Sequence, residues 1–192
     1  MKLRLSSRMK KVLLSIISIF AIQLCVFAYE TVLIDFPANQ RWDAVYYATQ
    51  GTEAILQYVP YGQSEKNWTK TLIFHSYKTL NQSGSAGTLM DTTTMQMENQ
   101  NTSQLYRYLK YSEMDSIATR CVQKNSRKDA QCEIYRTSKS FEGLISMHYI
   151  NKNVQEYKST YNTWYNIVKN IRIYQSYYRD NRVMDKASSF EL

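Results

Sequence analysis

Two histidines, His75 and His148, are the only imidazoles in this 192-residue chain. Imidazole is the commonest base in enzymes, and a hydrolase would need it beside a Ser or Cys nucleophile and an orienting acid. No Gly-x-Ser-x-Gly, His-Glu-x-x-His or phosphate-binding glycine motif accompanies either histidine. We therefore interpret both as strand residues and expect no enzyme. A secreted hydrolase that uses His75 or His148 is the alternative.

Cys121 and Cys132 are the other residues with reactive side chains in the body of the chain. Two cysteines without a Cys-x-x-Cys spacing, together with two distant histidines, do not form a recognisable metal site, so no metal or cofactor is expected. Both lie in predicted strands, Ser116–Gln123 and Ala130–Ser138, on either side of a polar reversal at 125–129. A turn centred there places Cys121 opposite Cys132 and predicts a cross-strand disulfide.

Aromatic residues gather around a turn within Tyr58–Phe74. Pro60 ends a strand because it has no N–H to donate, and a glycine supplies the conformational freedom of the reversal. Aromatic side chains on a loop provide contact area for a protein or glycan partner. The candidate binding residues are Tyr61, Gly62, Trp68 and Trp42. The alternative is that these rings only cap the edge of a sheet.

The first 28 residues have the composition of a signal peptide. Five basic residues precede a run of apolar residues at 12–27, and Val26-Phe27-Ala28 predicts cleavage after Ala28. An uncleaved anchor is the alternative, but the apolar run is shorter than a membrane span of roughly 20 residues. We expect a secreted or periplasmic protein with no stable membrane span after cleavage.

Removal of this segment changes the charge of the protein. The whole chain carries +8, whereas residues 29–192 contain 19 basic and 16 acidic side chains and carry +3. A charge of this size without dense basic runs does not favour nucleic-acid binding. The composition therefore points to partners other than DNA or RNA.

Hydrophobic periodicity predicts the elements that position these residues. The predicted strands are 31–36, 44–49, 52–59, 69–77, 116–123, 130–138 and 144–150. One helix is predicted from Leu89 to Tyr108 after a loop at 80–87. A second is predicted to start at Asn153, with Glu156 reaching back to it in a capping box. Its aromatic stripe, expected to be core, contains Tyr157, Tyr161, Trp164 and Tyr165.

The order of these elements predicts an α+β fold. Because most connections are too short for parallel crossovers, we expect a mostly antiparallel sheet of about six to seven strands covered by two main helices. One domain is predicted at 29–176, followed by a flexible C-terminal tail at 177–192.

One pattern of residues resembles a known family. A strand followed by Val59-Pro60-x-Gly62-Gln63, then Asn67-Trp68-Thr69 opening another strand, and a late helix with a Trp are similar to small exported proteins of the PsbP-like superfamily. The resemblance covers most of residues 40–174. It implies a central antiparallel sheet between helices and an accessory or binding role. The cysteine hairpin and the Tyr-rich last helix are not part of it.

Overall fold

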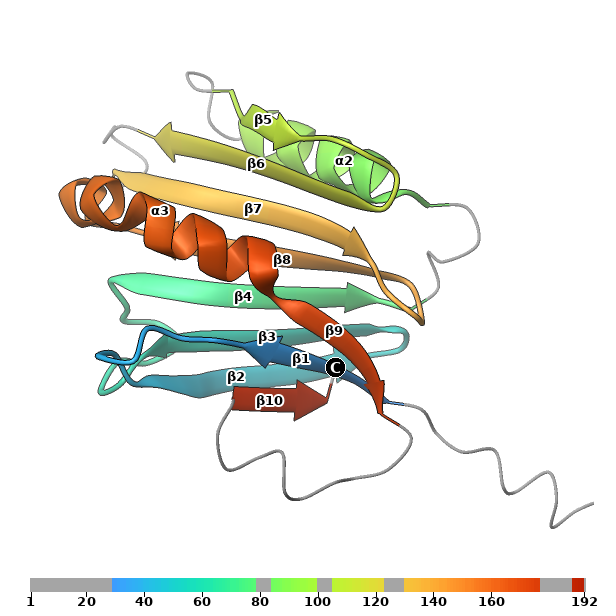
Figure 1. The fold of residues 1–192 in the computed structure, drawn as a ribbon, viewed down its shortest axis with the longest axis horizontal. Coiled ribbons are helices and arrows are strands. Elements are labelled where there is room, and N and C mark those ends of the chain that lie inside the picture. The colour runs from blue at the N-terminus through green and yellow to red at the C-terminus, as the bar shows by residue number, and fades with distance from the viewer. Residues whose placement is uncertain (1–28, 79–83, 100–104, 123–129, 177–187, 192) are drawn as a thin grey trace, which may run out of the picture.

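The computed structural model describes residues 29–78, 84–99, 105–122, 130–176 and 188–191 (Figure 1). The predicted signal peptide and the reversal at 125–129 lie outside these residues. The described elements are β1 Tyr29–Ile34, β2 Trp42–Gln50, β3 Glu53–Pro60, β4 Lys70–Tyr77, α2 Ala86–Asn99, β5 Arg107–Lys110, β6 Asp115–Val122, β7 Gln131–Lys139, β8 Leu144–Asn151, α3 Val154–Asn170, β9 Arg172–Ser176 and β10 Ser188–Glu191.

A seven-stranded antiparallel sheet forms the body of the fold, in the order β2-β3-β4-β8-β7-β6-β5. A smaller sheet has the order β10-β1-β9. The β2–β3 hairpin turns through Gly51, whose φ of 61° suits glycine far better than a residue with a Cβ. The predicted α+β class, with a mostly antiparallel sheet and two main helices, is confirmed.

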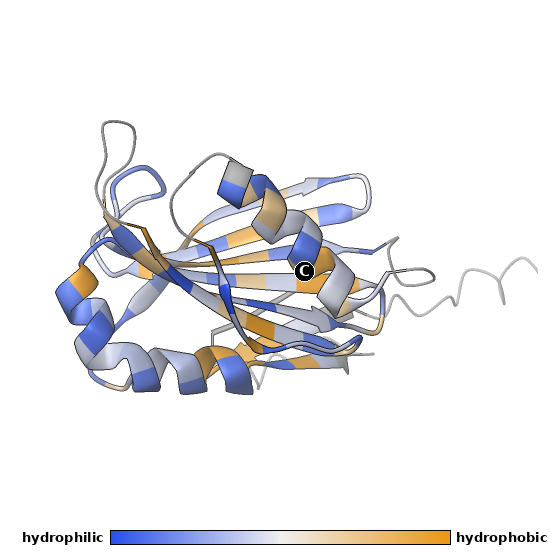
Figure 2. Cartoon of the chain, turned by 90° about the horizontal axis from the view of Figure 1, so that it is seen from above, coloured by the Kyte–Doolittle hydropathy of each residue, from blue (hydrophilic) through white to orange (hydrophobic). Residues whose placement is uncertain are grey.

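The two helices cover opposite faces of the large sheet, as Figure 2 shows. Successive residues of a strand point to opposite faces, and β7 illustrates this: Ile134 packs in the main core with α3, whereas Tyr135 packs with Met90 of α2. We call these the α3 face and the α2 face. Strand β1 also packs on the α3 face, through Val32 and Ile34.

Aromatic rings fill the core on the α3 face. Trp164 of α3 is stacked on Tyr149 of β8, with ring centroids 4.1 Å apart, and meets the edge of Trp42 at 5.0 Å. Trp42 in turn stacks on Phe36 at 5.2 Å. Of the predicted aromatic stripe, Tyr157 and Trp164 are buried, while Tyr161 and Tyr165 pack against the core with part of each ring exposed. The stripe is therefore core, as predicted.

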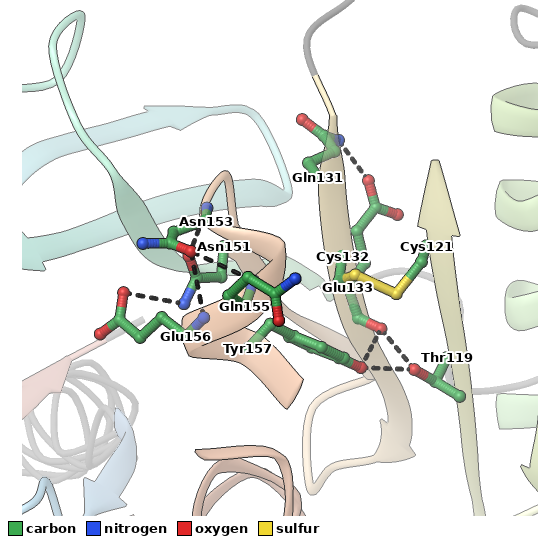
Figure 3. Close-up of a disulfide and its surroundings, with 10 residues drawn as sticks. All are labelled: Thr119, Cys121, Gln131, Cys132, Glu133, Asn151, Asn153, Gln155, Glu156 and Tyr157. Atoms are coloured by element: carbon green, nitrogen blue, oxygen red, sulfur yellow. Dashed lines mark hydrogen bonds between the residues drawn. A yellow bond between two sulfur atoms is a disulfide. The ribbon is translucent and has the colours of Figure 1, made fainter. Parts of the chain in front are cut away.

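Helix α3 starts as expected at Asn153, whose side-chain oxygen accepts hydrogen bonds from the N–H groups of Gln155 and Glu156 (Figure 3). The predicted capping box is wrong. The Asn153 N–H donates to Asn151 Oδ1 at 2.8 Å, and the Glu156 carboxylate pairs with Lys70 instead. Lys70 is nearly buried on β4 opposite Asn151, so its charge holds the carboxylate.

The first predicted helix differs from α2 at both ends. Helix α2 begins at Ala86, which was predicted to belong to the loop at 80–87. Ser85 Oγ caps the helix by accepting the N–H of Thr88 at 3.0 Å. It ends at Asn99, and Tyr108 belongs to strand β5 instead. The Tyr108 hydroxyl donates back to Asp91 of α2 at 3.0 Å. The apolar spacing that suggested one long helix therefore reflects a helix and a strand that contact each other.

The predicted C-terminal tail at 177–192 lies only in part within the described residues. Residues 177–187 and 192 lie outside them, whereas Ser188–Glu191 form β10, paired antiparallel with β1. On the other side of β1, β9 continues the chain directly after α3. The small sheet thus joins the first described strand to the last two.

The predicted disulfide between Cys121 and Cys132 is confirmed (Figure 3). The two residues are direct partners in the β6–β7 register, as the sequence indicated. Cys132 is fully buried on the α3 face. The bond therefore ties a core residue of β7 to the neighbouring strand.

Replacement of both cysteines by Ser should lower the free energy of unfolding by about 3 kcal/mol, because the bond closes a loop with a sequence separation of 11. Urea unfolding of the variant and of the oxidised wild type measures the difference. Reduced wild-type protein is the control and should unfold at the same urea concentration as the variant. An unchanged midpoint in both would contradict the prediction.

Candidate functional site

The aromatic turn connects β3 to β4, and we define it as residues 60–69. Gly62 has a φ of 82°, a conformation that few residues other than glycine adopt readily. The Gln63 N–H donates to the carbonyl of Pro60 at 3.1 Å. Ser64 and Asn67 then exchange backbone hydrogen bonds at 3.1 and 3.2 Å. The backbone of the turn is thus held by its own hydrogen bonds.

Side-chain hydrogen bonds close the turn at its base. Gln63 Oε1 accepts the Thr69 N–H at 2.8 Å, and Gln63 Nε2 donates to Thr69 Oγ1 at 3.0 Å. Ser64 Oγ also accepts the N–H of Asn67 at 3.2 Å. A loop fixed in this way loses little further conformational entropy when it binds a partner.

Tyr61 and Trp68 present rings on this turn, each with a cation above it. The Tyr61 side chain is 63% exposed, with the Arg41 guanidinium 4.2 Å from the ring centroid. Trp68 is partly exposed, with Lys152 Nζ at 3.7 Å. Both distances fit cation–π contacts. A small pocket of about 230 Å³ beside Trp68 is lined by Gly62, Gln63, Ser64, Asn67, Trp68 and Thr69.

Trp42 does not belong to this surface. It was predicted as a binding residue, but it is 6% exposed and lies in the core between Phe36 and Trp164. A β-bulge in β2 between Ala44 and Tyr46 explains this. The bulge shifts the register by one residue, so Trp42 and Tyr46 point to opposite faces of the sheet although they are four residues apart. Trp42 faces α3, whereas Tyr46 pairs with Gln57.

The two histidines lie on the α2 face of neighbouring strands. His148 of β8 is opposite Ile73, and His75 of β4 is opposite Ser146, so the histidines occupy diagonal positions on one face. Each has its own acid. His75 Nε2 lies 2.9 Å from Glu53 Oε2, and His148 Nε2 lies 3.2 Å from Glu133 Oε2.

Both ring nitrogens of His75 have hydrogen-bond partners. Its second nitrogen, Nδ1, is 2.8 Å from the Tyr77 hydroxyl, so both ring nitrogens are engaged. Burial, the largest cause, raises the pKa of Tyr77 to about 12, which keeps the phenol protonated at neutral pH. Glu53 and Tyr77 thus hold the His75 ring from both sides.

His148 belongs to a buried network centred on Glu133, which sequence analysis did not identify. The Glu133 carboxylate accepts hydrogen bonds from Tyr106 at 2.5 Å, from Arg120 at 3.1 Å and from Gln131. The Arg120 guanidinium also lies 4.3 Å from the centre of the Tyr106 ring. The side chains of Arg120 and Glu133 are 2% and 1% exposed.

The network keeps Glu133 ionised. Burial alone would raise the pKa of Glu133, but His148, Arg120 and Tyr106 together outweigh burial, and the net effect is a pKa well below its ordinary value. Burial and the neighbouring Glu133 charge raise the pKa of Tyr106 in turn. The carboxylate thus links Tyr106 to residues of β6, β7 and β8.

The described residues contain neither a metal-binding cluster nor a membrane-spanning helix. No group of three or more His, Cys, Asp or Glu side chains there is arranged to hold a metal ion. None of the helices in the same part of the chain has the length and hydropathy needed to span a membrane.

The aromatic turn is therefore the candidate site. It contains Tyr61, Gly62 and Trp68, three of the four residues predicted to bind a partner, and it excludes Trp42. The cations over its two rings, Arg41 and Lys152, come from outside the turn. No local sequence motif indicates that Arg41 lies over Tyr61 or that Lys152 lies over Trp68. Comparison of the chain with protein-family models, with curated proteins and with solved structures finds no match.

Proposed function

We propose that this protein is a non-catalytic binding or accessory protein of the periplasm or the extracellular space, and that its partner contacts the aromatic turn. The observation that carries the proposal is the pair of rings on the turn, Tyr61 exposed and Trp68 partly exposed, where Gln63 and Thr69 close the loop by hydrogen bonds. Exposed aromatic rings on a rigid loop provide binding energy at a low entropic cost.

The chemistry of the turn favours a protein or a glycan as partner. The pocket beside Trp68 has room for one side chain or one sugar ring, and amide and hydroxyl groups surround it. A cation lies over each of the two rings, so the turn offers aromatic and basic groups together. Export through the segment 1–28 agrees with the disulfide, which forms in oxidising compartments. Membership of the PsbP-like superfamily stays a prediction.

Tyr61→Ala should weaken partner capture about tenfold or more, which is the effect of losing one aromatic anchor from an interface. The melting temperature should change little, because the ring is 63% exposed. We would capture proteins and glycans from native extract with immobilised wild type and quantify the same species on the variant.

Tyr47→Ala is the matched control, since Tyr47 is 51% exposed on β2, outside the turn. Its captured species should equal those of the wild type. Equal capture by wild type and Tyr61→Ala would remove the turn as the binding site. Loss of capture by Tyr47→Ala would move the site to the edge of the sheet.

A further inference from the structure

A second pocket, of about 720 Å³, lies where the end of β7 meets the junction of α3 and β9. Its lining residues are 114, 136, 138–141 and 171–174, so it shares none with the aromatic turn. The volume is within the range of small-molecule sites, roughly 300–1,000 Å³. No local motif marks this pocket, because three separate parts of the chain build it.

The charged lining of this pocket is entirely basic: Arg136, Lys139 and Arg172, with no carboxylate. Lys139 forms no ion pair with any described residue. Arg172 lies 3.9 Å from Asp35, but both side chains are more than half exposed, and such pairs contribute little. The pocket therefore offers at least two cations that an anionic ligand can neutralise.

Arg136 is held in a fixed position at the base of the pocket. Its Nε donates to Asp115 at 2.7 Å, and its Nη1 donates to the carbonyls of Val168 and Ile171, each at 2.9 Å. These bonds cap the C-terminal end of α3. They use three of the five N–H groups of the guanidinium, so the two on Nη2 have no partner among the described residues. A fixed arginine with free donors is preorganised to bind a carboxylate, phosphate or sulfonate.

Apolar side chains surround these cations. Met114, Phe141 and Tyr174 all line the pocket, with exposures of 62%, 57% and 43%. Exposed apolar side chains that gather around a pocket are typical of ligand sites. A small inorganic anion would leave these side chains in water, whereas a ligand with an apolar body would cover them.

We propose that this pocket binds a small amphiphilic anion. The acidic group of the ligand contacts Arg136, Lys139 and Arg172, and its alkyl chain or ring lies against Phe141, Met114 and Tyr174. This function is independent of the aromatic turn, so either site can bind without the other.

The test uses dansyl-undecanoic acid, a fluorescent carboxylate with an alkyl chain, titrated with the full-length protein. We expect saturable binding that laurate displaces and that weakens as the salt concentration rises. Lys139→Ala combined with Arg172→Ala should weaken binding about tenfold or more. Arg136 is left intact because it also caps α3.

Two controls decide the outcome. Lys158→Ala combined with Arg107→Ala removes the same number of charges from exposed positions outside both the pocket and the aromatic turn, and should leave the affinity within about twofold of wild type. Dodecanol, which has the chain without the charge, should compete poorly. Absence of binding, equal competition by dodecanol, or an unchanged affinity of the pocket variant would overturn the proposal. So would binding only to vesicles of phosphatidylglycerol and not to the monomeric probe.

Discussion

Glu133→Ala is expected to lower the free energy of unfolding at pH 7 by about 3–5 kcal/mol. The substitution leaves the guanidinium of Arg120, 2% exposed, without its counter-ion, and it also removes the acceptor of Tyr106 and His148. A loss of this size is a large share of the 5–15 kcal/mol that stabilises a typical domain. Urea unfolding measures it. The matched control is Glu53→Ala, which removes an exposed carboxylate from His75 and should cost at most about 1 kcal/mol.

The contribution of Glu133 should also depend on pH. Because the pKa of Glu133 is lower in the folded protein than in the unfolded chain, its carboxylate stabilises the fold above the ordinary pKa of about 4.5. This stabilisation is lost progressively as the pH falls below that value. The difference between the wild type and Glu133→Gln, measured at pH 7, 4 and 3, should therefore shrink on acidification. A difference that stays constant over this range would contradict the assigned direction.

Trp164→Ala is the second substitution with a large expected effect, about 3–5 kcal/mol. The ring is 1% exposed, stacks on Tyr149 and contacts the edge of Trp42, so its removal opens a cavity between α3 and the sheet. For a domain of this size the loss corresponds to a fall in melting temperature of about 6–20 °C. A thermal melt followed by far-UV circular dichroism measures it.

Trp68→Ala is the matched control for Trp164→Ala. Because the Trp68 ring is only partly buried and its main contact is Lys152, the expected cost is about 1–2 kcal/mol. The two variants separate a tryptophan of the core from one of the proposed binding surface. If Trp68→Ala lowered the melting temperature as much as Trp164→Ala, the turn would be a structural element and the proposed binding site would be removed.

Local patterns in the sequence determined much of this fold. The alternation of residues in the strand predicted at 69–77 puts Leu72 and Phe74 on one face, because a strand has a side-chain period of two, and both are buried. The polar reversal between two strands set Cys121 opposite Cys132, since the register of a hairpin follows from the position of its turn. The same register pairs Arg120 with Glu133, so the buried ion pair was also present in the sequence as a cross-strand signal.

Contacts between distant segments decided the rest. The bulge in β2 turned Trp42 toward the core. Strand β1 pairs with β9 and β10, which follow it by more than 130 residues in the sequence, and so lies in the small sheet instead of the large one. The cations over Tyr61 and Trp68 and the basic pocket around Arg136 each combine residues from separate segments. The sequence by itself determined seven of the described strands, β1–β4 and β6–β8, together with the last helix and the disulfide, because these depend on near neighbours. Only the tertiary structure decided which rings and charges meet, because that depends on how the helices and the small sheet pack on the large one.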